Sequence, residues 1–426
     1  MSNKAKAIDM KKDGQLALIP KLRFPEFQDA AGWNTAPGDE LFEQINNRQA
    51  PPGLPILAIT QEYGAIPRDL IDYHVSVADK SVETYKEVRP GDFIISLRSF
   101  QGGIEYSDYH GICSPAYVIL RKRTELSEPF FKQHFKSHSF IQQLTKNLEG
   151  LRDGKMVSYK QFSELLLLNP PPFEQQKIAK CLSSVDELIA AQARKLDALK
   201  TYKIGLMQQL FPREDETQPR LRFPEFQDSE EWISDSLGSI FGTSSGGTPD
   251  RAKEKYWNGS IPWITTSLVD FNIIREANEF ITDAGLSNSS AKLFPKETIL
   301  VAMYGQGKTR GQVAMLGIEA ATNQACAAIL PRKGIDPRFV FLNLGSRYEE
   351  MRRLSNSGGQ ENLSQGLIQG LPFSYPEDVA EQQRIADCLT SLDSLITAQT
   401  QKLNAFKIHK KGLMQQLFPS QMEVEA

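Results

Sequence analysis

Two short glycine-rich segments carry the side chains best suited to contact a polar ligand. Residues 98–103 read Arg-Ser-Phe-Gln-Gly-Gly, and residues 304–310 read Tyr-Gly-Gln-Gly-Lys-Thr-Arg. Glycine lets a backbone approach a phosphate, while arginine, lysine and glutamine carry hydrogen-bonding groups that match base edges. The chemistry that these residues suggest is base readout on DNA, without any covalent step.

Two more segments of the same character come before long helical patterns, at residues 152–155 and 358–362. Taken alone, each of the four segments is more often a solvated turn, so the prediction depends on their paired arrangement. The candidate DNA-binding residues are Arg98, Ser99, Gln101, Gly102, Arg152, Lys155, Tyr304, Gln306, Lys308, Thr309, Arg310, Gly359, Gln360 and Asn362.

Patterns of catalytic residues are incomplete. Residues 305–309 resemble the end of a phosphate-binding loop, but the first glycine of that pattern would fall at Ala302. Asn169-Pro170-Pro171 resembles the turn of adenine methyltransferases, yet Pro172 separates it from Phe173 and no methyl-donor loop follows a clear strand. The four cysteines and five histidines lack metal-ligand spacing. We therefore predict no catalytic residue, no metal site and no enzymatic activity.

The chain contains two internal repeats, which dictate its architecture. The segment Leu-Arg-Phe-Pro-Glu-Phe-Gln-Asp occurs at residues 22–29 and again at 221–228, and a tryptophan follows each copy. Residues 174–212 match residues 381–419 at about two-thirds of positions, and both copies end in Gly-Leu-Met-Gln-Gln-Leu-Phe-Pro. The order is therefore short motif, variable region, long motif, twice over.

The long repeat has the four-three spacing of a heptad seam, which predicts a helix that packs on another helix. Prolines at 170–172 and 376 precede the two copies, and Pro212 and Pro419 end them. Residues 184–187 could cap a break near the start of the first helix. The seam residues are Ile178, Leu182, Val185, Ile189, Gln192, Leu196, Leu199, Lys203, Leu206 and Leu210, then Ile385, Leu389, Leu392, Ile396, Gln399, Leu403, Phe406, Lys410, Leu413 and Leu417.

The natural partner of each helix is the other copy, because matched helices in one chain have a high effective concentration. Gln192 and Gln399 occupy matching seam positions, where a polar residue fixes register and partner. We expect an antiparallel intramolecular coiled coil with approximate two-fold symmetry, in which helix length acts as a ruler. The alternatives are homodimerisation seams or helices in separate bundles.

The variable regions are of ordinary domain size and have an α+β pattern. Strand-like runs at 91–96 and 295–302 precede the two glycine-rich segments. The predicted divisions are an N-terminal arm at 1–20, a domain at 21–165, a helical spacer at 166–215, a second domain at 216–372 and a second spacer at 373–426.

Composition sets outer limits on these interpretations. The chain has 426 residues, 40% of them hydrophobic, and a formal net charge of only -3. Phosphate contacts would therefore need local clusters of lysine and arginine. Residues 1–13 hold four lysines but no apolar segment, and no run approaches a membrane span. We expect a cytoplasmic protein.

The repeated motifs together resemble the specificity subunit of type I restriction-modification systems. The resemblance rests on two copies each of Lys/Arg-Leu-Arg-Phe-Pro-Glu-Phe, Glu-Gln-Gln-x-Ile-Ala and Gly-Leu-Met-Gln-Gln-Leu-Phe, and it covers essentially the whole chain. Residues 322–328, Thr-Asn-Gln-Ala-Cys-Ala-Ala, also resemble a stretch of that family's recognition domains, whereas the first half has Gly-Ile-Cys-Ser-Pro-Ala at 111–116.

The resemblance implies that each variable region is a target recognition domain that reads one half of a split, asymmetric site in double-stranded DNA. The helices would set the gap and dock two modification subunits, which would use S-adenosylmethionine to methylate an adenine in each half-site. Restriction subunits would add ATP- and magnesium-dependent translocation and cleavage. No cofactor is expected in this chain itself.

Two other classes of function remain open to test. A self-contained methyltransferase or nuclease fused to its reader would modify DNA without a partner subunit. A coiled-coil scaffold whose variable regions bind proteins would not shift duplex DNA in a sequence-specific way.

Overall fold

The computed structural model describes residues 18–71, 82–146, 157–213, 216–305, 308–354 and 362–419. The chain divides into two compact units. The first unit is residues 1–193 with 401–426, and the second is residues 194–400. Each of the two long helices therefore begins in one unit and ends in the other. No helix within the described ranges combines the length and apolar character needed to cross a membrane.

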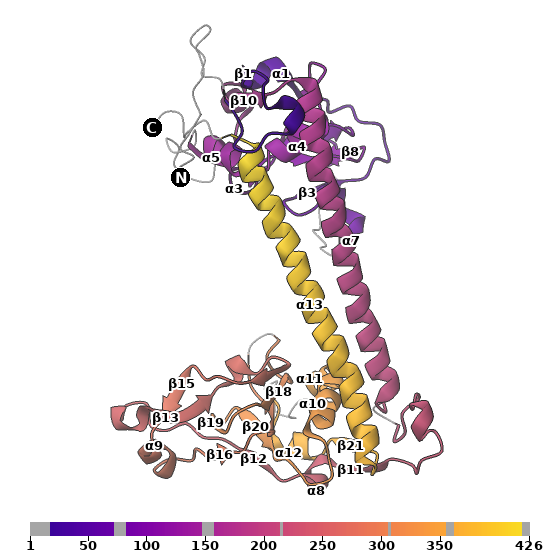
Figure 1. Cartoon of the computed structure of the whole chain (residues 1–426), viewed down its shortest axis with the longest axis vertical. Coiled ribbons are helices and arrows are strands. Elements are labelled where there is room, and N and C mark those ends of the chain that lie inside the picture. Colours follow the sequence, from indigo (N-terminus) through magenta and orange to yellow (C-terminus); the bar gives the residue numbers. More distant parts are fainter. Residues whose placement is uncertain are drawn as a thin grey trace. The chain divides into compact units, whose positions relative to one another are not determined.

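The long helices are α7, Pro172–Leu210, and α13, Val379–Leu417. Both are continuous (Figure 1), so the break considered at residues 184–187 is absent. Each ends just before the Phe-Pro that closes the repeat, as expected because proline cannot continue a helix.

The seam residues lie on the buried side of these helices, as the heptad spacing predicts. Those at most 9% exposed are Ile178, Leu182, Gln192, Leu196, Leu210, Ile385, Leu389, Leu403 and Leu417. Those of intermediate exposure include Ile189, Leu206, Ile396, Gln399 and Leu413. Gln192 and Gln399 both have interaction partners.

The two helices run antiparallel within each unit. In the first unit, Ile178 and Leu182 of α7 share a core with Leu417 of α13, and Lys410 Nζ lies 2.7 Å from Asp186 Oδ1. In the second unit the same pair recurs with the helices exchanged, as Lys203 Nζ lies 2.5 Å from an oxygen of Asp393. The intramolecular antiparallel pairing is thus confirmed.

The first unit contains a four-stranded antiparallel sheet and three two-stranded pairs. The sheet order is β2-β9-β6-β7, and the pairs are β1-β10, β3-β4 and β5-β8. The strands are β1 Asn34–Pro37, β2 Phe42–Ile45, β3 Leu57–Thr60, β4 Gly64–Pro67, β5 Lys86–Val88, β6 Phe93–Ile95, β7 Glu105–Tyr106, β8 Gly111–Cys113, β9 Val118–Lys122 and β10 Leu166–Asn169. The shorter helices are α1 Gly38–Leu41, α3 Ser99–Gly102, α4 Glu128–His134, α5 His138–Lys146 and α6 Tyr159–Ser163.

The second unit has a five-stranded sheet, β12-β20-β17-β18-β14, a four-stranded sheet, β15-β13-β19-β16, and the pair β11-β21. The strands are β11 Ile233–Ser236, β12 Thr243–Ser245, β13 Trp257–Ile264, β14 Asn272–Ile274, β15 Glu279–Ile281, β16 Leu293–Phe294, β17 Ile299–Ala302, β18 Val313–Leu316, β19 Ala320–Thr322, β20 Cys326–Ile329 and β21 Pro372–Tyr375. The shorter helices are α8 Leu237–Ile240, α9 Asp283–Ser287, α10 Pro337–Ser346, α11 Tyr348–Arg353 and α12 Gln365–Gln369.

The central sheets of the two units have the same strand order. β2, β9, β6 and β7 correspond in sequence order and pairing to β12, β20, β17 and β18. The α+β prediction is confirmed in both units. The turn between β8 and β9 corresponds to the turn between β19 and β20, and residues 111–116 and 322–328 share this turn. Residues 111–116 begin with β8, whereas residues 322–328 continue into β20, so the two segments correspond only in part.

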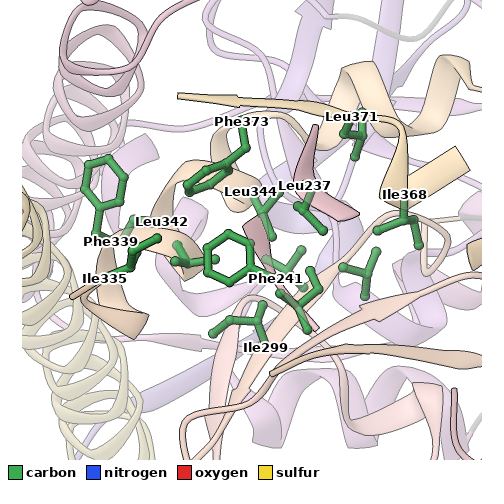
Figure 2. Close-up of a cluster of buried hydrophobic side chains, with 14 of the residues drawn as sticks. Leu237, Phe241, Ile299, Ile335, Phe339, Leu342, Leu344, Ile368, Leu371 and Phe373 are labelled. Atoms are coloured by element: carbon green, nitrogen blue, oxygen red, sulfur yellow. The ribbon is translucent and has the colours of Figure 1, made fainter. Parts of the chain in front are cut away.

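Each unit has a core of aromatic and aliphatic side chains that includes the end of a long helix. In the second unit Phe241, Phe339 and Phe373 lie together with Leu237 and Ile299 (Figure 2). Phe211, just after α7, stacks edge-on against Phe339 at a centroid distance of 5.4 Å. In the first unit Phe418, just after α13, packs against Phe130 in a tilted arrangement at a centroid distance of 5.5 Å. Burial of these rings fastens each helix end to a domain core.

The two repeated motifs bind each other inside each unit. Arg23 of the short motif donates to both carboxylate oxygens of Glu174, at 2.7 and 2.8 Å. Arg222 makes the same fork with Glu381, at 2.9 and 2.6 Å. A bidentate arginine–carboxylate pair is geometrically demanding. The identity of the repeats is therefore explained by a structural task, the anchoring of each long helix at its first turn.

Candidate nucleic-acid interface

In the first unit the segment predicted as a loop follows the central strand β6, and its residues Ser99–Gly102 form the one-turn helix α3 instead of an open loop. The Ser99 hydroxyl accepts a hydrogen bond from the Ser96 amide at 2.8 Å, and the Gly103 amide donates to the Ser99 carbonyl at 2.8 Å. Gly103 has φ +80°, and a Cβ there would lie 2.0 Å from the Phe135 carbonyl oxygen. Only glycine fits this place.

The candidate side chains of this loop take different positions. Arg98 and Gln101 are exposed, whereas Ser99 is 1% exposed and serves the turn itself. Gly102 lies against the side chain of Gln61. Arg98 and Gln101 are therefore the members of this segment that can reach a ligand.

A neighbouring hairpin adds residues that the sequence analysis missed. Gln61, in the β3–β4 turn, donates to the Arg98 carbonyl at 3.3 Å. Turn and loop together line an open pocket of about 1010 Å³, whose walls include Gln61, Tyr63, Leu70, Ser96, Leu97 and Arg98. The only signal in the sequence was a polar turn between two β-branched runs, which does not reveal where the turn lies.

Helices α4 and α5 hold the same loop from the other side. Lys136, just after α4, donates to the Gly102 carbonyl at 2.9 Å and to Glu105 at 2.6 Å, and Thr145 of α5 donates to the Phe100 carbonyl at 3.1 Å. Burial lowers the pKa of Lys136 and raises the pKa of Glu105. The loop backbone is thus fixed by side chains from outside the loop.

In the second unit three segments meet at Met303, directly after β17. The Met303 amide donates to the Ala325 carbonyl at 2.8 Å, and the Leu363 amide donates to the Met303 carbonyl at 3.0 Å. These bonds bring Tyr304 close to Asn362, two residues that the sequence placed in separate candidate segments. They also bring in Gln324, which is exposed and accepts a hydrogen bond from Thr248 at 2.5 Å.

Helix α11 holds this loop, as Lys136 after α4 and Thr145 of α5 hold the loop of the first unit. The Tyr348 hydroxyl donates to the Lys308 carbonyl at 2.5 Å and accepts from Arg352 at 2.9 Å. Arg310 is 8% exposed and donates to the Arg352 carbonyl at 3.0 Å. Arg310 is therefore turned inward and holds the loop, while Tyr304 and Lys308 are exposed and Thr309 is half-buried.

Five candidates, Arg152, Lys155, Gln306, Gly359 and Gln360, lie outside the described residues. Among the residues that are described, no group of three or more His, Cys, Asp or Glu could hold a metal ion. Burial raises the pKa of the Cys113 and Cys326 thiols to about 12, so neither is a nucleophile at neutral pH.

The fold and these loops define a class of protein: two related α+β units on a pair of antiparallel helices, each presenting a polar loop after its central strand. Residues 229–407 match the family described as the type I restriction modification DNA specificity domain. The chain is 29% identical over 176 residues to the specificity subunit of the type I restriction enzyme EcoR124I/EcoR124II of Escherichia coli. This match covers 41% of this chain and 43% of that protein.

A longer match joins it to the putative type I restriction enzyme MjaX specificity subunit of Methanocaldococcus jannaschii, at 21% identity over 84% of this chain and 81% of that one. A chain from a structure of the assembly of a type I R-M system has a similar fold, with a TM-score of 0.59, 17% identity, and coverage of 91% and 98%. The matches to the first two relatives span less than half of their lengths. Residues 229–407 thus match the type I restriction modification DNA specificity domain, and the chain as a whole is similar to the specificity subunits of type I restriction-modification systems.

Proposed function

We propose that this chain is the DNA-reading subunit of a type I restriction-modification complex, with each unit reading one half of a split, asymmetric site. The observation that carries the proposal is the correspondence between the units. The same strand, β6 or β17, leads in each unit into a segment that is held by side chains from the helical region after the sheet. The exposed side chains differ: they are Arg98 and Gln101 in one unit and Tyr304 and Lys308 in the other. Like scaffolds with unlike side chains suit two different base sequences.

The chain itself is proposed to be non-catalytic and cytoplasmic. Modification subunits, two per chain, would dock on the helices and use S-adenosylmethionine to methylate one adenine in each half-site after flipping it out of the stack. Restriction subunits would supply the ATP- and magnesium-dependent steps. Partner subunits would also supply much of the phosphate contact, which fits a net charge of only -3.

Selection from a random pool of duplexes tests this function. The chain is assembled with its modification subunit, and the bound DNA is sequenced. We expect a motif of two specified blocks separated by an unspecified gap. Arg98→Ala should relax the preference in one block and Lys308→Ala in the other, by about 1–3 kcal/mol at a position with a bidentate contact. Each variant is the control for the other. A verified assembly that enriches no motif would leave the protein-scaffold function as the better interpretation.

A further inference from the structure

The pocket beside Arg98 in the first unit has an apolar wall on an otherwise polar candidate interface. Tyr63, Leu70 and Leu97 line it and are 60%, 61% and 52% exposed. Partly buried Ile59 and Ile66 line the same pocket. Single exposed apolar side chains need no explanation, but a cluster of large ones around one pocket marks an interaction site.

The wall is built from three segments held in fixed relation to the loop. Tyr63 lies in the β3–β4 turn, and Leu70 ends a single 3-10 turn after β4. Leu97 precedes Arg98 on the loop after β6. Gln61 joins the turn to the loop through its bond to the Arg98 carbonyl, and the Arg68 amide donates to the Ile56 carbonyl at 3.0 Å. The apolar wall and the exposed guanidinium are therefore presented together.

We propose that this pocket reads thymine in the half-site of the first unit, through contact of its apolar wall with the thymine 5-methyl group. The inference rests on the proposed function, since it takes the pocket to face DNA. In the major groove the thymine methyl is the apolar group that base edges offer, whereas the other groups there are hydrogen-bond donors or acceptors. Burying a polar edge against leucine without a partner is unfavourable, so the wall selects for the methyl group.

The second unit provides an internal comparison. In its corresponding loop, Tyr304 and Lys308 are exposed and Thr309 is half-buried. The sequence of residues 303–312 contains no leucine. The proposal therefore assigns methyl reading to the first unit. Replacing thymine by uracil removes only the 5-methyl group, which makes it the matched chemical probe.

The experiment measures the affinity of the chain, assembled with its modification subunit, for the selected duplex and for duplexes in which each thymine is replaced by uracil. At one or more positions of the first unit's half-site, we expect uracil to weaken binding about fourfold, the value for one buried methyl group. Leu97→Ala and Leu70→Ala should reduce that thymine preference while the complex still binds the site. Leu166→Ala changes an exposed leucine of the same unit outside the pocket, so the preference should be retained.

The outcomes separate this inference from the function on which it rests. If the complex binds a split site but that half-site contains no thymine, or uracil binds equally well at every position, the inference is wrong and the proposed function stands. If Leu97→Ala weakens assembly with the modification subunit, and the complexes that still form keep the full thymine preference, the wall docks protein and the inference is also wrong. If the assembled complex binds no specific duplex, both fail.

Discussion

At the scale of single residues, His134 of the first unit is a buried ionisable side chain. It is fully buried among Phe130, Phe140 and Phe418, and neither ring nitrogen has a hydrogen-bond partner among the described residues. Burial lowers its pKa to about 3. Asn343 takes the corresponding place on α10 in the second unit, and its side-chain oxygen is also buried without a partner there.

This histidine predicts a pH dependence of stability. Its pKa is about 3 when folded and about 6.5 when unfolded, so between these values the unfolded chain binds the extra proton. The contribution of the neutral His134 ring to the free energy of unfolding is therefore fully present above pH 6.5. It falls by about 1.4 kcal/mol for each pH unit below pH 6.5. The free energy of unfolding of the parent should therefore fall on going from pH 7.5 to pH 5. In His134→Phe that fall should be smaller by about 2 kcal/mol, as measured by urea unfolding at both pH values.

Asn343→Leu is the matched control, because an amide does not titrate. It should shift the free energy of unfolding by the same amount at both pH values. If His134→Phe kept the full pH dependence of the parent, another group would have to be responsible.

At the scale of elements, the helices that follow each central sheet fix the candidate loops. The Tyr348 hydroxyl contacts both the Lys308 carbonyl and Arg352. Tyr348→Phe removes these bonds and keeps the ring, which packs edge-on against Phe271 at 5.2 Å. We expect specific DNA binding to weaken about three- to tenfold, because the bond to the Lys308 carbonyl is the one that holds the loop and a single hydrogen bond of ordinary strength has this value.

The readout that separates positioning from general stability is base discrimination. Tyr348→Phe should relax the preference in the second unit's half-site and leave the first unchanged, as measured by binding to duplexes with single base changes. Tyr202→Phe, on an exposed face of α7, is the control. An equal loss in both half-sites would argue for a fold defect instead.

The lysine–aspartate pairs on the long helices make a second prediction at this scale. Lys410→Asp places two carboxylates where Lys410 and Asp186 now lie 2.7 Å apart, so the melting temperature should fall. The double variant Asp186→Lys, Lys410→Asp should recover much of the loss. The coupling should be about 0.2–1 kcal/mol, because both side chains are partly exposed. No recovery in the double variant would show that the pair does not contribute to helix pairing.

The elements also show what the sequence could predict. The helices could be predicted because a heptad seam is a local and regular signal, and Ile178 or Leu389 at a seam position can only be buried against a partner. The suggested break at residues 184–187 was wrong because tertiary packing along α7 outweighs a local capping signal. The inward turn of Arg310 and the approach of Gln61 to Arg98 depend on contacts between distant segments, which spacing cannot reveal.

At the scale of the whole molecule, each long helix belongs to both units. Leu210 and Phe211 are part of the second unit's core, and Leu417 and Phe418 are part of the first unit's core. The sequence repeats predicted that the chain consists of two related halves. The strand order that the two central sheets share confirms this prediction. The order itself could not be predicted, because short strands paired across long stretches of chain carry little register information.

The helices are proposed to set the gap between half-sites, and their length can be changed without touching either loop. Inserting one heptad into both helices, opposite one another, keeps the seam in phase. The gap in the bound motif should lengthen, as read by duplex selection. An insertion in one helix only is the control and should destabilise the pairing, since the partner seam then falls out of register. A correctly assembled double-insertion protein with an unchanged gap would contradict the ruler.

The most direct test is to co-express the chain with its modification subunit in cells that lack other adenine methyltransferases and to map modified adenines by single-molecule sequencing. We expect one split motif with a modified adenine in each half, altered in one half only by Arg98→Ala. Modification in a single continuous motif, or no modified motif despite verified assembly, would contradict the claim that two unlike readers share this chain.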